Sequence, residues 1–121
     1  MKILIEKDGI GIDIVDVQRF SKKIFKENLT FYQKIFVESE IKYCLRFESP
    51  YEHFAGKFAL KESVIKSIHE NISFLDIETS HLNAKPVVKL KSSLQKKYQF
   101  LVSISHEKDF AIGIVIAKKI S

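Results

Sequence analysis

The stretch SPYEHFAGKFALKESVIKSI, residues 49–68, decides most of the fold. It opens with Ser49 and Pro50, and Glu52 follows three residues after the serine, which is the pattern of a capping box with proline at the first helical position. The apolar residues that follow keep near-helical spacing: Phe54, Phe58, Val64, Ile65 and Ile68. The stretch therefore predicts one long helix that Ser49 caps and that ends near Ile68.

On the N-terminal side of this stretch, one strand and two helices are predicted. Residues 9–16 alternate small and β-branched side chains, as a strand does. Residues 16–27 carry apolar side chains at helical spacing, and a further helix is expected over residues 38–47. Helices thus gather in the first half of the chain.

On the C-terminal side, strands dominate. Four are predicted, over residues 73–81, 86–90, 100–106 and 110–117. The first two join at a turn at Asn83-Ala84-Lys85 and the last two at Lys108-Asp109, while Ser92 is expected to cap a short helix through Tyr98. Helices first and strands later predict an α+β fold, with helices packed on an antiparallel sheet.

Length and composition narrow the class of protein. A chain of 121 residues predicts one domain over residues 1–121, and a hydrophobic content of 45% excludes a disordered chain. Cys44 is the only cysteine, which excludes an intrachain disulfide and fits a reducing compartment. No apolar run is long enough for a signal peptide or a membrane span, so we expect a soluble cytoplasmic protein without a membrane partner.

The net charge of +5 suits an anionic partner, although ordinary solubility explains it as well. The basic residues fall into two groups: Arg19, Lys22, Lys23 and Lys26, within the helix predicted over residues 16–27, and Lys89, Lys91, Lys96 and Lys97. No RNA-binding aromatic signature or zinc-finger spacing accompanies them, so no nucleic-acid partner is expected.

The first strand has two unlike faces. Gly9, Gly11 and Asp13 share one face, while the isoleucines between them form the other. Two glycines beside one carboxylate predict a shallow, open surface where a bulky ligand or an ion could approach. The alternative is a glycine-weakened edge strand whose Asp13 faces water.

Glu62 and Lys66 are four residues apart on the long helix and therefore lie on one side of it. A carboxylate amid apolar residues needs a partner or a metal, because burying an unpaired charge costs several kcal/mol. The alternative is a surface ion pair worth about 0.2–0.5 kcal/mol. Asp13 and Glu62 together suit Mg²⁺, which takes one or two protein carboxylates, and Lys66 could meet a phosphate as a point charge.

Ser105 and His106 end a predicted strand, where a hydroxyl and an imidazole can bind phosphate oxygens. A solvated strand end is the alternative. The other histidines, His53, His69 and His81, show no metal-ligand spacing with Cys44 and are interpreted as ordinary residues.

Three segments in this order resemble the small type of phosphopantetheinyl transferase, the holo-acyl-carrier-protein synthases. They are GIGIDIVDV (9–17), FAGKFALKESVIK (54–66), and VSISHE (102–107) followed by FAI (110–112). The resemblance implies an α+β trimer with active sites between subunits. It also implies Mg²⁺-dependent transfer of the phosphopantetheine arm from coenzyme A to a serine of apo-acyl carrier protein, which serves fatty acid biosynthesis.

The resemblance also assigns roles to the site residues. Asp13 and Glu62 match the magnesium ligands, and Lys66 matches the contact to the coenzyme A phosphates. His106, with Ser105 beside it, is expected to reach the coenzyme of a neighbouring subunit. Glu62, acting through a metal-bound water, is the candidate base for the serine proton.

The resemblance implies that the basic group within residues 16–27 docks the acidic carrier protein. Arg19 matches a position that contacts the carrier protein, and the cluster of Lys22, Lys23 and Lys26 fits that role by charge complementarity.

The chain departs from the family pattern in four places. Residues 68–71 lack the family's glycine-rich turn, Asn83-Ala84-Lys85-Pro86 lacks a turn glycine, and Lys57 replaces a common arginine. Val37 stands where a capping threonine is common, which predicts a frayed helix start.

Two rival functions remain open from the residues alone. One is a magnesium-dependent nuclease, because carboxylates and lysines serve there too. The other is a non-catalytic basic module that binds an acidic partner.

Overall fold

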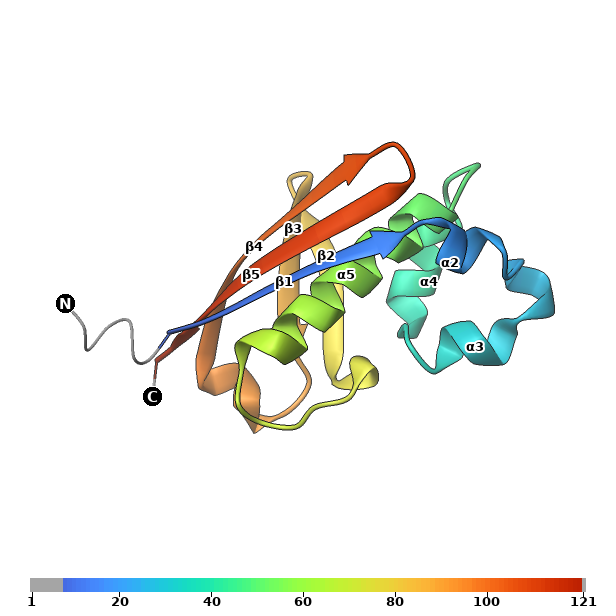
Figure 1. The fold of residues 1–121 in the computed structure, drawn as a ribbon. Coiled ribbons are helices and arrows are strands. Elements are labelled where there is room, and N and C mark those ends of the chain that lie inside the picture. Colours follow the sequence, from blue (N-terminus) through green and yellow to red (C-terminus); the bar gives the residue numbers. More distant parts are fainter. Residues whose placement is uncertain (1–7, 121) are drawn as a thin grey trace.

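The computed structural model describes residues 8–120 of the chain. Its main sheet has the order β1-β5-β4 and is antiparallel throughout, and β2 and β3 form a separate antiparallel pair (Figure 1). The strands are β1 (Asp8–Asp16), β2 (Ile77–Leu82), β3 (Lys85–Leu90), β4 (Tyr98–Glu107) and β5 (Phe110–Lys119). The helices are α2 (Gln18–Ser21), α3 (Leu29–Gln33), α4 (Glu38–Cys44) and α5 (Tyr51–Ser67). Short 3-10 turns cover Phe25–Glu27, Phe74–Asp76 and Ser93–Lys96. The predicted α+β fold is confirmed.

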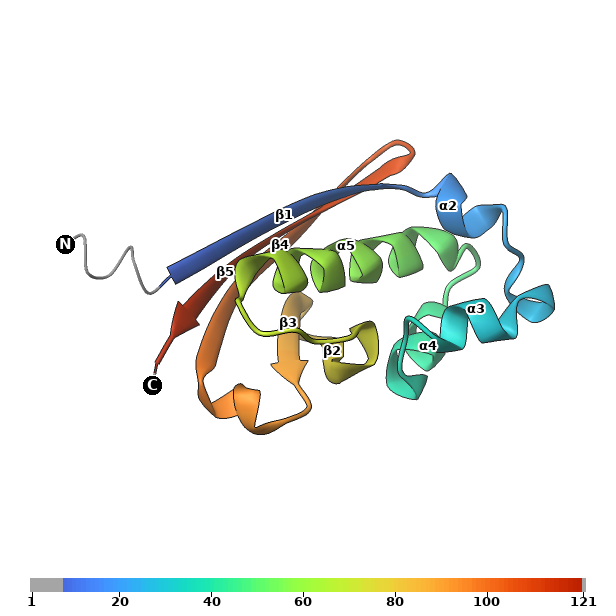
Figure 2. The same cartoon turned by 60° about the horizontal axis from the view of Figure 1, so that its bottom comes forward.

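Helix α5 is the middle layer, between the main sheet and the β2–β3 hairpin (Figure 2). It approaches the sheet so closely that glycine is required opposite it. A Cβ atom at Gly11 would lie 1.8 Å from the carbonyl oxygen of Ser63, and one at Gly9 would lie 1.7 Å from that of Ser67. The open surface predicted at these glycines is therefore wrong, because their lack of side chains serves helix–sheet packing and not ligand access.

Two apolar clusters fill the interior. One lies where α5 meets the short helices and is rich in aromatic rings, among them Phe20, Tyr32, Phe36 and Phe54. The other lies between α5, the β2–β3 hairpin and the main sheet, and includes Leu60, Val64, Ile77 and Val115. Both clusters contact α5, so the longest helix organises the whole packing.

The helix predicted over residues 16–27 is broken. Helix α2 ends at Ser21, Ile24 is extended at φ −53° and ψ 128°, and a 3-10 turn follows. The Tyr32 hydroxyl lies 2.9 Å from the carbonyl oxygen of Phe20 and 2.7 Å from that of Lys23. The hydroxyl can donate to one of these carbonyl groups at a time, and it thereby ties the end of α2 to α3 where the chain leaves the helix.

Several predicted boundaries also shift. No side-chain capping bond forms at the start of α5, so the expected Ser49 cap is absent, while the helix ends one residue before Ile68. Helix α4 stops at Cys44 and not at residue 47. Strand β2 begins at Ile77 because the Asp76 carboxylate accepts the Ser73 N–H at 2.8 Å and closes a 3-10 turn.

The start of α4 is anchored, contrary to the fraying predicted from Val37. A valine side chain accepts no hydrogen bond, but the Val37 N–H donates to Glu40 Oε1 at 2.8 Å. This is the half of a capping box that the residue three positions into the helix supplies.

Both predicted hairpins are confirmed. Asn83 and Ala84 have φ values of 52° and 67°, which fits a two-residue turn even without glycine, and Lys108 has φ 54°. Among the described residues, no helix is long and apolar enough to cross a membrane.

Candidate functional site

The structure brings Asp13 and Lys66 together at the edge of the main sheet. Lys66 Nζ lies 3.1 Å from Asp13 Oδ1 and donates to the carbonyl oxygen of Ile12 at 3.0 Å. The Asp13 side chain is 18% exposed and that of Lys66 is 50% exposed. A carboxylate and an ammonium that are 53 positions apart in sequence thus meet at an accessible edge.

Glu62 lies one helical turn before Lys66 and projects from the same side of α5. It is half-buried, as expected for a carboxylate beside packed apolar residues. No group of three His, Cys, Asp or Glu side chains that could hold a metal occurs within residues 8–120. The two carboxylates of Asp13 and Glu62 suit Mg²⁺, which needs one or two carboxylates and takes its other ligands from water and phosphate. They do not suit Zn²⁺, which takes three or four protein ligands.

Ser105 and His106 do not join this group within one chain. Strand pairing places Asp13 beside Gly113 and Gly113 beside Ile104, so β5 separates Asp13 from β4. His106 Nε2 lies 3.1 Å from the carbonyl oxygen of Glu52, at the start of α5. Because side chains alternate along a strand, Ser105 points to the other face of the sheet.

The basic residues expected to dock a carrier protein surround the break after α2. Arg19 lies over the Phe58 ring at 4.6 Å, and Lys23 lies over the Phe31 ring at 5.1 Å. Lys22 and Lys26 are exposed. The prediction that these four residues share one helix is wrong, because the helix breaks after Ser21. They nevertheless lie at the same end of the molecule.

The outer face of the main sheet is apolar and uncovered. Ile10, Ile12 and Ile14 are 65%, 59% and 61% exposed. Strand pairing continues this face onto β5 and β4 with Ile112, Ile114, Ile116 and Leu101. Figure 2 shows α5 on the opposite side of the sheet. An apolar field of this kind marks an interaction surface.

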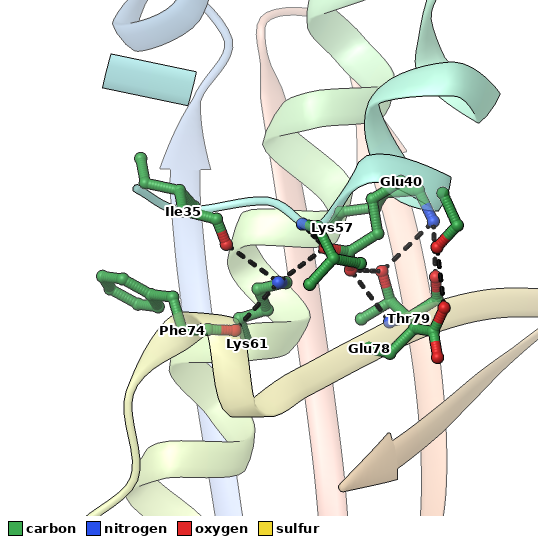
Figure 3. Close-up of polar contacts among 9 residues, drawn as sticks. Ile35, Glu40, Lys57, Lys61, Phe74, Glu78 and Thr79 are labelled. Atoms are coloured by element: carbon green, nitrogen blue, oxygen red, sulfur yellow. Dashed lines mark hydrogen bonds and ion pairs between the residues drawn. The ribbon is translucent and has the colours of Figure 1, made fainter. Parts of the chain in front are cut away.

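A buried polar network is the feature that the sequence analysis missed (Figure 3). Lys61 Nζ lies 2.6 Å from Glu40 Oε1, and both side chains are fully buried. Lys57 Nζ donates to the carbonyl and hydroxyl oxygens of Thr79, each at 3.1 Å. Burial lowers the pKa of both lysines, and the Glu40 carboxylate opposes that shift. The available signal was two lysines, Lys57 and Lys61, four positions apart among the apolar residues of the long helix, because lysines require partners when buried.

Two histidines interpreted as ordinary lie in an aromatic cluster between α4, α5 and β2. The His53 ring stacks on Phe47 at 3.7 Å between centroids, and the His81 ring stacks on Tyr43 at 4.7 Å. Burial lowers the pKa of both histidines; His106 lowers that of His53 further, and Lys57 lowers that of His81 further.

Comparison with known proteins gives a family match over residues 9–115, to the model of the 4'-phosphopantetheinyl transferase superfamily. A holo-[acyl-carrier-protein] synthase of Thermodesulfovibrio yellowstonii is 36% identical over 112 residues, which cover 90% of this chain and 96% of that protein.

Solved structures agree with the family match. A holo-(acyl-carrier-protein) synthase from Bacillus anthracis in complex with coenzyme A (3',5'-ADP) superposes with a TM-score of 0.77 at 32% identity, covering 93% of this chain and 96% of that one. The Helicobacter pylori synthase in complex with coenzyme A gives a TM-score of 0.77 at 33% identity, covering 90% and 99%.

Proposed function

Because the chain belongs to the 4'-phosphopantetheinyl transferase superfamily, we propose that it transfers the phosphopantetheine arm of coenzyme A to a serine of apo-acyl carrier protein. The observation that carries this proposal is the contact between Lys66 and Asp13 at the sheet edge, with Glu62 one turn away. These are the three positions that match the family's phosphate and metal contacts. Coenzyme A in the similar synthases supports the donor.

Magnesium is proposed as the metal, held by Asp13 and Glu62. Both offer only oxygen ligands, and the described residues supply no third side chain that would favour another ion. When bound, Mg²⁺ would neutralise charge on the pyrophosphate of the donor.

Transfer needs few protein groups, because positioning and charge stabilisation dominate phosphoryl transfer. The serine oxygen attacks the β-phosphorus and forms a phosphoester, while the phosphoanhydride bond breaks and adenosine 3',5'-bisphosphate leaves. Lys66 leaves Asp13 for the pyrophosphate and stabilises the developing negative charge as a point charge. Glu62 is the proposed base for the serine proton and would receive it through an intervening water, because its carboxylate is also the proposed metal ligand.

A homotrimer with sites between subunits is proposed for the assembly. The exposed isoleucines of the outer sheet face supply an apolar surface that a second copy can cover. Within one chain, His106 lies on β4 and Asp13 lies on β1, at opposite edges of the main sheet. A shared site would bring His106 and Ser105 of one subunit to the coenzyme that Asp13, Glu62 and Lys66 of another subunit hold.

Arg19, Lys22, Lys23 and Lys26 are proposed to dock the acidic carrier protein. All four are exposed and lie at one end of the molecule, so they offer a positive surface for complementary charge. A cytoplasmic location is proposed from Cys44, which is buried and unpaired and whose pKa burial raises to about 12.

Intact mass spectrometry tests the function. Apo-acyl carrier protein is incubated with this protein, coenzyme A and Mg²⁺, and the carrier is expected to gain one phosphopantetheine arm. A carrier with its acceptor serine changed to alanine, and a reaction with chelator, serve as controls. No gain of mass on several apo-carrier proteins would overturn the proposed function.

A further inference from the structure

Helix α5 is held from two nearly opposite sides. Toward the main sheet, the backbone of Ser63 and Ser67 lies against Gly11 and Gly9, where no side chain intervenes. On the other side, Lys61 reaches away from the sheet into a buried polar network (Figure 3). Ser63 and Lys61 are two residues apart, which turns them about 200° around the helix axis.

The network on the far side joins four segments through one ion pair. Lys61 Nζ contacts Glu40 Oε1 at 2.6 Å and donates to the carbonyl oxygens of Ile35 at 2.8 Å and Phe74 at 2.9 Å. The other oxygen of Glu40 accepts from the Thr79 N–H at 2.8 Å and from the Thr79 hydroxyl at 2.5 Å. Four segments are thereby fixed to one point of α5: the loop after α3, the start of α4, the turn before β2, and β2 itself.

Glu62 and Lys66 lie on the flank between these two supports. Glu62 follows Lys61 by one residue and precedes Ser63 by one, so it projects about 100° from each. A small rotation of α5 would turn Glu62 toward the sheet or toward solvent, and it would carry Lys66 away from Asp13. The Lys61–Glu40 pair opposes such a rotation, because its partners lie on separate segments.

A role in stability alone explains the pair poorly. Removing two charges from water is costly, and buried ion pairs can often be replaced by well-packed hydrophobic side chains of similar volume without loss of stability. Such a replacement does not reproduce the fixed direction of the two short, charge-assisted hydrogen bonds that Glu40 accepts, one from Lys61 and one from the Thr79 hydroxyl.

We propose that Lys61 and Glu40 are positioning residues for the transfer reaction: their buried ion pair sets the rotation of α5 and so holds Glu62 and Lys66 in line with Asp13. This inference rests on the proposed function, because it concerns residues assigned to the coenzyme and metal site. It adds two residues that contact neither substrate nor metal and act through α5.

The test is the double variant Lys61→Met/Glu40→Gln, which removes both charges and keeps one acceptor for Thr79. It gives up the acceptor of the Val37 N–H and the donor to the Ile35 and Phe74 carbonyl groups. Thermal unfolding gives the unfolding temperature of each variant. Below that temperature, we measure kcat and the KM for carrier protein. Electron paramagnetic resonance gives the dissociation constant for Mn²⁺ in the absence of coenzyme.

We expect a lower unfolding temperature, because buried polar groups lose their partners, together with a kcat lower by about 10- to 100-fold and Mn²⁺ affinity weaker by a similar factor. The KM for carrier protein should change less than kcat does, because the four docking residues lie outside α5 and, of the four, Arg19 lies over an α5 ring, that of Phe58.

Val64→Ala is the matched control, because it removes buried apolar atoms from the same helix and leaves the ion pair intact. It should lower the unfolding temperature and leave kcat and Mn²⁺ affinity within about twofold of the wild type. If the double variant does not fold, Glu40→Asp retracts the carboxylate from Lys61 by one methylene and is expected to shift kcat and Mn²⁺ affinity in the same direction.

Wild-type kcat and Mn²⁺ affinity in a folded double variant, or in Glu40→Asp, would overturn the positioning role. A wild-type protein that binds Mn²⁺ but transfers nothing would overturn the proposed function instead. The Mn²⁺ titrations of the variants would then still decide whether Lys61 and Glu40 position Glu62.

Discussion

At the scale of single residues, a substitution of Glu62 gives the most direct test of the proposed site. Glu62→Gln keeps the size of the side chain and removes its charge, so kcat should fall by about 100-fold or more. The unfolding temperature should stay nearly constant, because the Glu62 side chain makes no hydrogen bond or ion pair within residues 8–120. Glu52→Gln, the same change at an exposed position of α5, is the control. Transfer at the wild-type rate by Glu62→Gln would remove Glu62 from the site.

Asp13, Glu62 and Lys66 were predicted as site residues from local signals, and their roles stay a prediction. A separation of four residues on a helix places Glu62 beside Lys66, and the first of the three family motifs, residues 9–17, contains Asp13. The Lys61–Glu40 contact has no such signal, since it joins residues on two different helices through packing that no short pattern specifies. The same holds for Tyr98, whose hydroxyl donates to Glu70 at 2.6 Å and whose pKa is raised to about 12 by burial and by that carboxylate.

At the scale of elements, the stacks that join α4, α5 and β2 make stability depend on pH. Burial is the main cause of the lowered pKa of His53 and His81. Both histidines also lie near Lys57, and His53 lies near His106 and Glu52 as well. The unfolded chain therefore binds more protons once the pH falls below 6.5, the ordinary value for histidine. The contribution of these two histidines to the free energy of unfolding is fully present above that pH and is lost progressively below it.

Urea unfolding between pH 5 and pH 8, a range chosen to span the titration of histidine, measures this loss. The variant His53→Phe/His81→Phe keeps two stacked rings that do not titrate, so its free energy of unfolding should fall less steeply below pH 6.5 than that of the wild type. His69→Gln changes an exposed histidine and should keep the wild-type slope. An unchanged slope in the double variant would show that these stacks do not carry the acid sensitivity.

Element boundaries show where local patterns fail. The hairpin turns were predictable because their register follows from alternation and turn length. The break after α2 was not, because the Tyr32 hydroxyl that contacts the carbonyl groups at this point comes from a later segment. The glycines of β1 were misinterpreted for a related reason: the strand sequence does not reveal that α5 lies against them.

At the scale of the whole molecule, the outer face of the main sheet decides the assembly. Light scattering should give three times the chain mass for the wild type. Ile12→Glu places a charge amid the exposed isoleucines and should give monomers with little transfer activity, because burying that charge between subunits is costly. Leu82→Glu changes an apolar residue that is equally exposed but lies at the tip of the β2–β3 hairpin, and it should leave the trimer intact. A monomeric wild type with full activity would exclude shared sites.

Shared sites also predict that two inactive proteins restore each other. Asp13→Ala keeps His106, and His106→Ala keeps Asp13, so a mixed trimer contains a complete site wherever an intact Asp13 of one subunit meets an intact His106 of the next. Equal amounts that unfold and refold together should recover roughly a quarter of wild-type activity, because each site draws each residue independently from the two pools. A site built within one chain would recover none, since every chain lacks one of the two residues. The strand order β1-β5-β4, which sets Asp13 and His106 at opposite edges, favours the first result.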